Sequence, residues 1–310
     1  MTVKQPYLSI CIPTYNRLDI LYKTLESIYA DLEDVDLEDF EVIVSDNEPN
    51  QSSKQIVEKF NFKNIYYFPA TCEGFLNSLN ALQCGKGMLL KLHNNYTKLK
   101  KGSLKKLILD AKQNIENKSI IFYTNGLKQT KDIRIFESFD AFLYQLSYFS
   151  SWSTGFSIWK EGLDVLPKNI EINKYFPQTS LLISQSYKKK YELNDLPLFE
   201  NQYIPHKGGY NIFKVFSVDY IELMQKSHLA GDISDKTFRK IKNDLLSNYI
   251  SSRYFRTVIA KIDKFETDDI KRSITKYYTK KDYYKMLILA FLFPLEFIWR
   301  KFFLSIKRAF

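Results

Sequence analysis

The amino-acid sequence predicts an α/β fold, with a mixed and mostly parallel sheet between helices and a helical extension at the carboxyl end. Short apolar runs rich in Ile and Val show little alternation, as expected for strands buried on both faces. Apolar residues spaced by three and four lie between these runs, which is typical of helices with one buried face. After about Ser217, glycine nearly vanishes and basic residues become frequent among helically spaced apolar ones.

The first apolar run, residues 8–12, is expected to be the first strand. Pro13 should end it, because proline has no N–H to donate to a sheet. Four polar residues then stand at the carboxyl end of the strand: Thr14, Tyr15, Asn16 and Arg17. Ligands of open α/β sheets bind outside that end. The next apolar residues predict a helix over 18–30, with its buried face formed by Leu18, Leu21, Leu25 and Ile28.

The second strand, expected over 40–46, repeats this design and leads into the polar residues Asp46, Asn47 and Glu48. A third strand is expected over 65–68, followed by a glycine-containing loop and a helix. Two polar clusters should therefore lie at the same edge of one sheet. Taken alone, Asp46 also fits a residue that caps the following turn, since Asp, Asn and Pro are common in turns.

Four blocks in fixed order, SICIPTYNR, EVIVSDNEPNQSS, EGFLNSLNALQCGKG and LLKLHNN...KKGSL, occur between residue 8 and about residue 104. Through them this region resembles the nucleotide-binding half of a family-2 glycosyltransferase with the GT-A fold. Such enzymes transfer a sugar from a nucleoside diphosphate donor to an acceptor glycan or a lipid-linked glycan. The resemblance implies an inverting enzyme of surface polysaccharide synthesis, such as capsule or O-antigen. It implies a donor site formed by Pro13, Thr14, Tyr15, Asn16, Arg17, Asp46, Asn47, Glu48, Asn77, His93 and Asn94.

The family usually carries an Asp-x-Asp cluster after the strand expected over 88–92, because oxygen ligands hold Mn²⁺ or Mg²⁺ against the diphosphate. Here the residues are His93, Asn94 and Asn95, without a carboxylate. Three possibilities follow: weak metal binding through Asn95 and the diphosphate, metal-independent transfer, or an inactive relative. His93 also fits a core or loop histidine. The alternative to an enzyme is a noncatalytic nucleotide-sugar-binding or scaffold protein in a glycan assembly complex.

Without a cation, the leaving diphosphate needs another positive charge. His206 and Lys207 are the candidates, because the glycines that follow them allow close backbone approach. A simple surface turn is the alternative for this segment.

The acceptor side is expected in residues 150–159, which resemble the family segment where a glycine-containing strand passes under the acceptor. Trp152 is a candidate to stack on a sugar ring. An inverting enzyme also needs a carboxylate as general base. In the family, an acidic residue is expected directly after the segment that corresponds to residues 176–179, but Ser180 stands there. Asp195 is therefore named as the candidate base.

The sequence divides into a glycosyltransferase-like domain over 1–216, a helical extension over 217–282 and an amphipathic, basic segment over 283–310. Pro294 and Glu296 interrupt the apolar run of the last segment short of the about 20 residues that a membrane span needs. We therefore expect this segment to lie in the interface of the cytoplasmic membrane, with its basic residues against anionic lipids. Docking on the protein's own core is the alternative.

The cysteines, the net charge and the tyrosine content indicate the cellular location and the class of partner. Cys11, Cys72 and Cys84 show no paired spacing, and no signal peptide precedes the first strand, so a cytoplasmic, peripheral protein with reduced thiols is expected. A net charge of +10 and 22 tyrosines are also typical of proteins that bind nucleic acids. No nucleic-acid motif is visible, and no nucleic-acid partner is expected.

Overall fold

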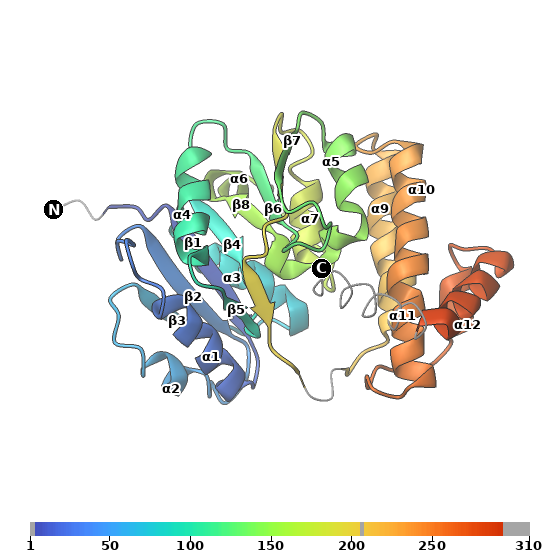
Figure 1. The fold of residues 1–310 in the computed structure, drawn as a ribbon, viewed down its shortest axis with the longest axis horizontal. Coiled ribbons are helices and arrows are strands. Elements are labelled where there is room, and N and C mark those ends of the chain that lie inside the picture. Colours follow the sequence, from blue (N-terminus) through green and yellow to red (C-terminus); the bar gives the residue numbers. More distant parts are fainter. Residues whose placement is uncertain (1–3, 205–207, 294–310) are drawn as a thin grey trace, which may run out of the picture. The chain divides into compact units, whose positions relative to one another are not determined.

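A computed structural model describes residues 4–204 and 208–293 of the chain (Figure 1). The chain divides into two compact units, Met1–Tyr203 and Ile204–Phe310. The boundary expected from the sequence, after residue 216, lies within the first helical stretch of the second unit.

The first unit is built on a five-stranded sheet with the order β3–β2–β1–β4–β8. Four strands run parallel, and β8 is antiparallel to β4. The strands are β1 (Leu8–Thr14), β2 (Phe40–Asp46), β3 (Ile65–Pro69), β4 (Leu89–Leu92) and β8 (Ser157–Trp159). The expected mixed, mostly parallel sheet is confirmed.

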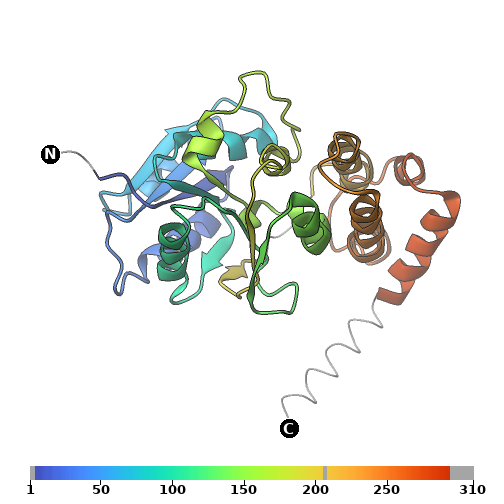
Figure 2. The same cartoon turned by 90° about the horizontal axis from the view of Figure 1, so that it is seen from above.

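Helices cover both faces of this sheet. The helix α1 (Leu18–Tyr29) connects β1 to β2, whereas α3 (Asn77–Cys84) lies between β3 and β4 and crosses in the opposite direction. Because such connections are right-handed, the two helices lie on opposite faces (Figure 2). The other helices of the first unit are α2 (Lys54–Val57), α4 (Ser103–Gln113), α5 (Phe139–Leu146), α6 (Lys160–Asp164) and α7 (Pro177–Ile183), with the 3-10 turns η1 (Gly74–Leu76), η2 (Ser147–Ser151) and η3 (Ser153–Gly155).

Two smaller sheets complete the first unit. One has the order β6–β9–β7, formed by β6 (Ile120–Tyr123), β9 (Tyr191–Asn194) and β7 (Ile133–Phe136). The other pairs β5 (Thr97–Leu99) with β10 (Phe199–Asn201).

The end of β1 differs from the expectation, because the strand continues through Pro13 to Thr14. The reason lies in which neighbour Pro13 faces. Cys11 accepts a hydrogen bond from the amide of His93, just after β4, so its backbone faces that strand. Pro13, two residues later, faces the same side, where β4 has already ended at Leu92. The missing N–H therefore removes no ladder hydrogen bond.

The second unit is helical where it is described, as expected. Three of its helical stretches are π-helical: η4 (Val215–Tyr220), η5 (Leu245–Ile250) and η6 (Phe255–Ile259). They continue the α-helices α8 (Ile212–Lys214), α9 (Ile221–Leu229), α10 (Asp235–Asp244) and α11 (Ser251–Tyr254), which α12 (Ile270–Thr275) and a helix over 280–293 follow. Within residues 4–204 and 208–293, none of the helices combines the length and apolarity that crossing a membrane requires.

Candidate functional site

The carboxyl ends of β1 and β2 are tied together by the side chain of Asn77, the first residue of α3. Its Nδ2 donates to the backbone oxygens of Thr14 (3.2 Å) and Ser45 (2.8 Å) and to Oδ1 of Asn47 (3.1 Å). Its Oδ1 accepts from Oγ of Ser45 at 2.5 Å and, over a longer distance, from the thiol of Cys72 at 3.9 Å. Asn77 is 2% exposed, so these hydrogen bonds are shielded from water and fix the spacing of the two strand ends.

A second amide, Asn95, reaches the same edge from the loop after β4. Its Nδ2 donates to Oγ1 of Thr14 at 2.9 Å, and its backbone oxygen accepts from Oγ1 of Thr24 at 2.7 Å. Within the described part of the chain, the side-chain oxygen of Asn95 accepts no hydrogen bond. The structure therefore brings together four residues of the predicted site: Thr14, Asn47, Asn77 and Asn95.

Asp46 is the last residue of β2, and its carboxylate is fully buried. Oδ1 accepts from the amide of Glu48 (3.0 Å), and Oδ2 accepts from the amide of Ser53 (3.2 Å) and the hydroxyl of Tyr67 (3.3 Å). These contacts are those of the turn-capping alternative. In this conformation the carboxylate organises the loop after β2, and its contact with a donor base stays a prediction.

Asn47 and Glu48 also hold the loops of this edge. Nδ2 of Asn47 donates to the backbone oxygens of Cys72 (3.0 Å) and Gly74 (3.3 Å). Oε2 of Glu48 accepts from the amide of Ser52 at 3.1 Å, and this hydrogen bond holds the pKa of Glu48 below its usual range. Asn47 thus joins the loop after β2 to the segment before α3, and Glu48 holds the loop after β2 together.

Three predicted donor residues present open surface. Tyr15 is 56% exposed, and Asn16 and Arg17 are exposed beside it. Asn16 has φ +46°, in the left-handed region that Asn tolerates better than most residues. Pro13 before them is half-buried. The part of this edge that a ligand can approach is therefore the segment between β1 and α1.

His93 is fully buried after β4. Its Nε2 lies 2.7 Å from the backbone oxygen of Thr97, so Nε2 carries the proton in the neutral ring. Burial, with the nearby amine of Lys91, lowers the pKa of His93 to about 3. The contacts of His93 are thus those of a neutral core histidine. Beside it, the backbone amide of Asn94 donates to Oγ1 of Thr154 at 3.1 Å.

Lys91 is a residue that the sequence analysis missed. It lies in β4 and is fully buried. Its Nζ donates to the backbone oxygens of Leu92 (2.9 Å) and Thr154, and it lies over the rings of Tyr123 (4.9 Å) and Phe199 (5.1 Å). Burial lowers the pKa of Lys91 well below its ordinary value. In the sequence, the signal for this buried amine is a single Lys within an otherwise apolar strand.

The segment expected on the acceptor side joins β4 through these contacts. Thr154 accepts from both Lys91 and Asn94. Gly155 admits no side chain, because a Cβ there would lie 2.1 Å from the ring of Phe122. Trp152 is half-buried, and its ring contacts Phe199 edge-on with centroids 6.5 Å apart. Residues 152–155 are therefore packed tightly against β4 and β6.

Asp195, the candidate base, follows β9 and is fully buried. Its Oδ1 accepts from Oγ1 of Thr124 (2.6 Å) and the amide of Lys128 (3.1 Å). Its Oδ2 accepts from the amide and hydroxyl of Thr130 (2.9 and 3.0 Å) and the amide of Lys131 (3.2 Å). Burial raises the pKa of Asp195, but these hydrogen bonds outweigh it and leave the pKa below its usual range. Such contacts hold the 124–131 loop, and the role as general base stays a prediction.

His206 and Lys207, the candidates for the diphosphate, lie outside the described residues. The glycine that follows them has a packing role of its own. A Cβ on Gly208 would lie 2.0 Å from the backbone oxygen of Lys264, with which this segment forms a β-bridge. Close backbone contact within the second unit therefore requires this glycine.

No cluster of three or more His, Cys, Asp or Glu side chains suited to a metal ion occurs within residues 4–204 and 208–293. The side chains that hydrogen-bond to Thr14 are the amides of Asn77 and Asn95, which bring no charge to a cation. Amides of this kind can exchange hydrogen bonds with an uncharged polar group, and Arg17 is an exposed cation at the same edge.

Residues 9–87 match the family model described as glycosyl transferase family 2. A search of curated proteins gave no match to the chain. Among solved structures, S. aureus TarS 1-349 is 16% identical with a TM-score of 0.56, over 81% of this chain and 75% of that one. The same TarS fragment in complex with UDP-GlcNAc is 17% identical with a TM-score of 0.56, over 87% and 79%. The mannosyltransferase PcManGT from Pyrobaculum calidifontis, in complex with GDP-Man and Mn²⁺, is 11% identical with a TM-score of 0.50, over 96% and 88%. At sequence identities this low, the structural similarity establishes a common fold alone.

Proposed function

Residues 9–87 carry the sequence pattern of family-2 glycosyltransferases on a GT-A fold, and on that premise we propose that the chain transfers a sugar from a nucleoside diphosphate donor to an acceptor glycan or lipid-linked glycan. The proposed setting is surface polysaccharide synthesis. The observation that carries the proposal is the polar edge where Asn77 joins the ends of β1 and β2. Tyr15, Asn16 and Arg17 are exposed beside it, at the end of the sheet where α/β proteins bind ligands.

In this proposal the nucleoside lies against Tyr15, Asn16 and Arg17, and Asn77 keeps their backbone in place through Thr14. The solved relatives support the donor class, since one contains UDP-GlcNAc and another contains GDP-Man with Mn²⁺. Asn95 is the residue here that would face a cation, through its unoccupied side-chain oxygen. A neutral amide oxygen binds a divalent cation more weakly than a carboxylate. We therefore propose donor binding with little dependence on Mn²⁺ or Mg²⁺.

A thermal-shift panel of uridine, guanosine, cytidine and thymidine diphosphates and their sugars, with and without Mn²⁺, tests the donor site. We expect one nucleotide class to raise the melting temperature, with a similar shift in both conditions. The variant Arg17→Gln should reduce this shift, whereas Lys23→Gln, which removes an exposed cation of the following helix α1, should leave it unchanged. The absence of any shift with every nucleotide would contradict the proposal.

The second candidate function is a noncatalytic nucleotide-sugar-binding protein. Two observations favour it: a histidine and two amides, His93, Asn94 and Asn95, occupy the usual carboxylate positions, and Asp195 is fully buried with both carboxylate oxygens engaged. Release of nucleoside diphosphate from the donor found by the panel separates the two functions. Turnover supports the transferase, whereas donor binding without hydrolysis or transfer supports the noncatalytic protein.

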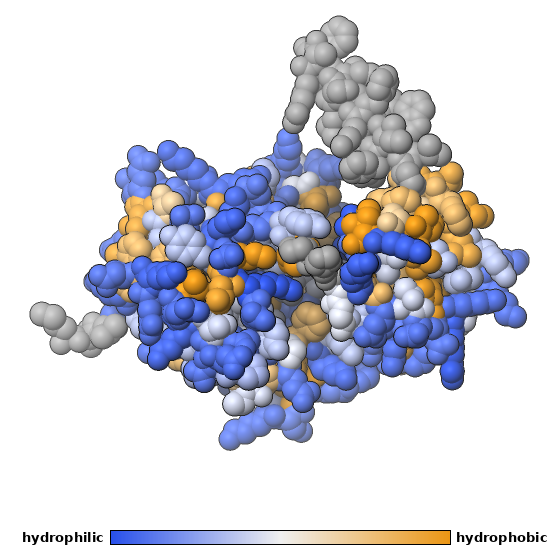
Figure 3. Space-filling view, turned by 90° about the horizontal axis from the view of Figure 1, so that it is seen from below, coloured by the Kyte–Doolittle hydropathy of each residue, from blue (hydrophilic) through white to orange (hydrophobic). Residues whose placement is uncertain are grey.

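We further propose that the carboxyl-terminal segment attaches the protein to the inner face of the cytoplasmic membrane. The helix over 280–293 exposes four apolar side chains on one face, at i, i+4, i+7 and i+8: Tyr284, Ile288, Phe291 and Leu292. Met286 and Ala290 are fully buried on its other face. Figure 3 shows apolar side chains gathered on the second unit. Residues 294–310 lie outside the described residues, and their sequence adds Trp, Phe, Lys and Arg, as interfacial segments do.

Fractionation of cells tests this attachment. The variant Ile288→Gln/Phe291→Gln should move protein from the membrane to the soluble fraction, because it removes apolar surface that would enter the lipid. Leu229→Gln is the control, since Leu229 is 78% exposed on another helix of the same unit. Equal membrane fractions for the two variants and the parent would contradict the proposal.

A further inference from the structure

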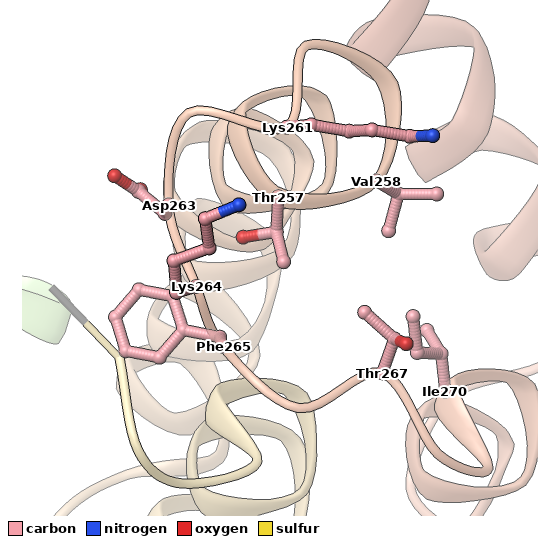
Figure 4. Close-up of a pocket in the computed structure, with 8 residues that line it drawn as sticks. All are labelled: Thr257, Val258, Lys261, Asp263, Lys264, Phe265, Thr267 and Ile270. Atoms are coloured by element: carbon pink, nitrogen blue, oxygen red, sulfur yellow. The ribbon is translucent and has the colours of Figure 1, made fainter. Parts of the chain in front are cut away.

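The second unit contains a pocket of about 530 Å³ beside η6 (Figure 4). It lies between η6 and the loop that leads to α12, and its lining includes Thr257, Val258, Lys261, Lys264, Phe265 and Ile270. None of these residues belongs to the proposed donor site, which is confined to the first unit.

The charges at this pocket favour an anion. Lys261 and Lys264 are exposed, and neither side chain has an ion-pair or hydrogen-bond partner among residues 4–204 and 208–293. Asp263 also lines the pocket, but its carboxylate is occupied by Arg253 (3.0 Å) and by two bonds from Arg256 (2.8 Å each). Three further acids of this loop, Glu266, Asp268 and Asp269, do not line the pocket. The lining therefore has a net positive charge.

A buried hydroxyl at the pocket lacks a partner. Thr257 is 6% exposed, and its Oγ1 has no hydrogen bond within the described part of the chain. A buried polar group without a partner is destabilising, and a bound water or ion is one of the partners that complete such groups in native proteins. Thr257 thus supplies a hydrogen-bond donor at a pocket whose rim carries two unpaired cations.

The pocket also has an apolar wall, which inorganic phosphate would not use. Val258, Phe265 and Ile270 form it. Ile262, next to Lys261, is 50% exposed, and Phe255 at the start of η6 packs against Phe293 with ring centroids 5.5 Å apart. The pocket therefore lies in the same part of the second unit as the end of helix 280–293, whose exposed apolar face is proposed to meet the membrane.

We propose that this pocket binds the phosphate of an anionic phospholipid headgroup. Lys261, Lys264 and Thr257 bind the phosphate oxygens, and the apolar wall contacts the carbon atoms next to the phosphate. Cations and hydroxyl donors together are the usual ligands of a phosphate group. This inference rests on the proposed membrane attachment and adds a lipid-specific site to it.

Binding of the full-length chain to vesicles tests the site. One set contains phosphatidylcholine alone, and the other also contains phosphatidylglycerol. The decisive variant is Thr257→Val, which keeps shape and charge and removes only the hydroxyl. We expect it to bind phosphatidylglycerol vesicles about fivefold more weakly than the parent and to melt at the same or a higher temperature, because the hydroxyl has no partner to lose. Thr275→Val, in α12 and outside the pocket lining, is the matched control and should bind like the parent.

Equal binding of Thr257→Val and the parent to phosphatidylglycerol vesicles would overturn the pocket while leaving general membrane attachment intact. Inorganic phosphate forms the third arm of the test. If phosphate raises the melting temperature of the parent but phosphatidylglycerol adds nothing over phosphatidylcholine, the ligand is a free phosphate and the lipid assignment is wrong. The nucleotide panel on the same variants keeps this result separate from the donor site, which shares none of these residues.

Discussion

Replacing Asn77 by alanine should weaken both the fold and the donor site. The change deletes three donated hydrogen bonds and two accepted ones, of which the bond from the Cys72 thiol is long at 3.9 Å, and Asn77 is only 2% exposed. Each of the four shorter bonds contributes about 1 kcal/mol net, which gives a total of about 4 kcal/mol. Thr14 O keeps a long bond from the amide of Asn47 at 3.4 Å, which reduces the loss. We expect the free energy of unfolding to fall by about 3 kcal/mol.

Urea unfolding of the parent and the variant measures this loss, and nucleotide titration of the folded variant measures its effect on the site. Asn80→Ala is the matched control. Asn80 lies one turn further along α3, and its side chain makes one short bond, to Oγ of Ser45 at 2.8 Å. The control should cost about 1 kcal/mol and retain nucleotide affinity. If the two variants lose the same stability, or if Asn77→Ala binds nucleotide like the parent, Asn77 does not organise the edge.

Three further predictions concern the buried groups of the first unit. Lys91→Met should remove a pH dependence of stability. Because burial lowers the pKa of Lys91, the unfolded chain binds one more proton than the folded chain, and the stability of the parent should rise relative to the variant by up to about 1.4 kcal/mol per pH unit below pH 10. Urea-denaturation midpoints that shift equally for both proteins between pH 8 and pH 9 would contradict this. Gly155→Ala should cost about 2 kcal/mol or more, since its Cβ would meet the ring of Phe122 at 2.1 Å; an unchanged melting temperature would show that the ring moves freely. Asp195→Asn should destabilise the 124–131 loop by about 3 kcal/mol and make it more sensitive to proteolysis, whereas a general base would instead show a transfer rate reduced at least about 100-fold at unchanged stability.

Local patterns were enough to predict the central fold. The strands β1 and β2 are buried along nearly their whole length, which is why their apolar runs show no alternation. The helix predicted over 18–30 is α1, Leu18–Tyr29, with Leu21, Leu25 and Ile28 buried as the spacing required. The family blocks also placed Asn77 at the polar edge, although its bonds to Thr14, Ser45 and Asn47 reach residues at least 30 positions away.

Long-range contacts explain what the sequence did not reveal. The sequence left both a ligand contact and a turn-capping role open for Asp46, and its oxygens accept hydrogen bonds from amides of the following loop, which depends on where that loop folds back. Lys91 looked like an ordinary strand residue, because its partner Thr154 lies 63 positions away. Pro13 was expected to end β1, but β4 stops two residues earlier and leaves no ladder bond for it to break. Such outcomes depend on strand register, which single-residue preferences do not encode.

The absence of carboxylates at 93–95 changes what must neutralise the donor diphosphate. Arg17 is the exposed cation at the edge, and it stands at the start of α1. Asn95 contributes a neutral oxygen, and His93 stays neutral across the physiological range because its pKa is lowered to about 3. A donor that binds here should therefore show affinity that falls with rising salt, since Arg17 is open to solvent.

Hydrogen–deuterium exchange with and without the nucleoside diphosphate identified by the panel shows whether the donor binds where β1 and β2 end. We expect slower exchange in peptides that cover residues 14–18 and 46–53, with little change in the second unit. Protection confined to other segments, or no protection at a saturating nucleotide concentration, would contradict the claim that this sheet edge binds the donor.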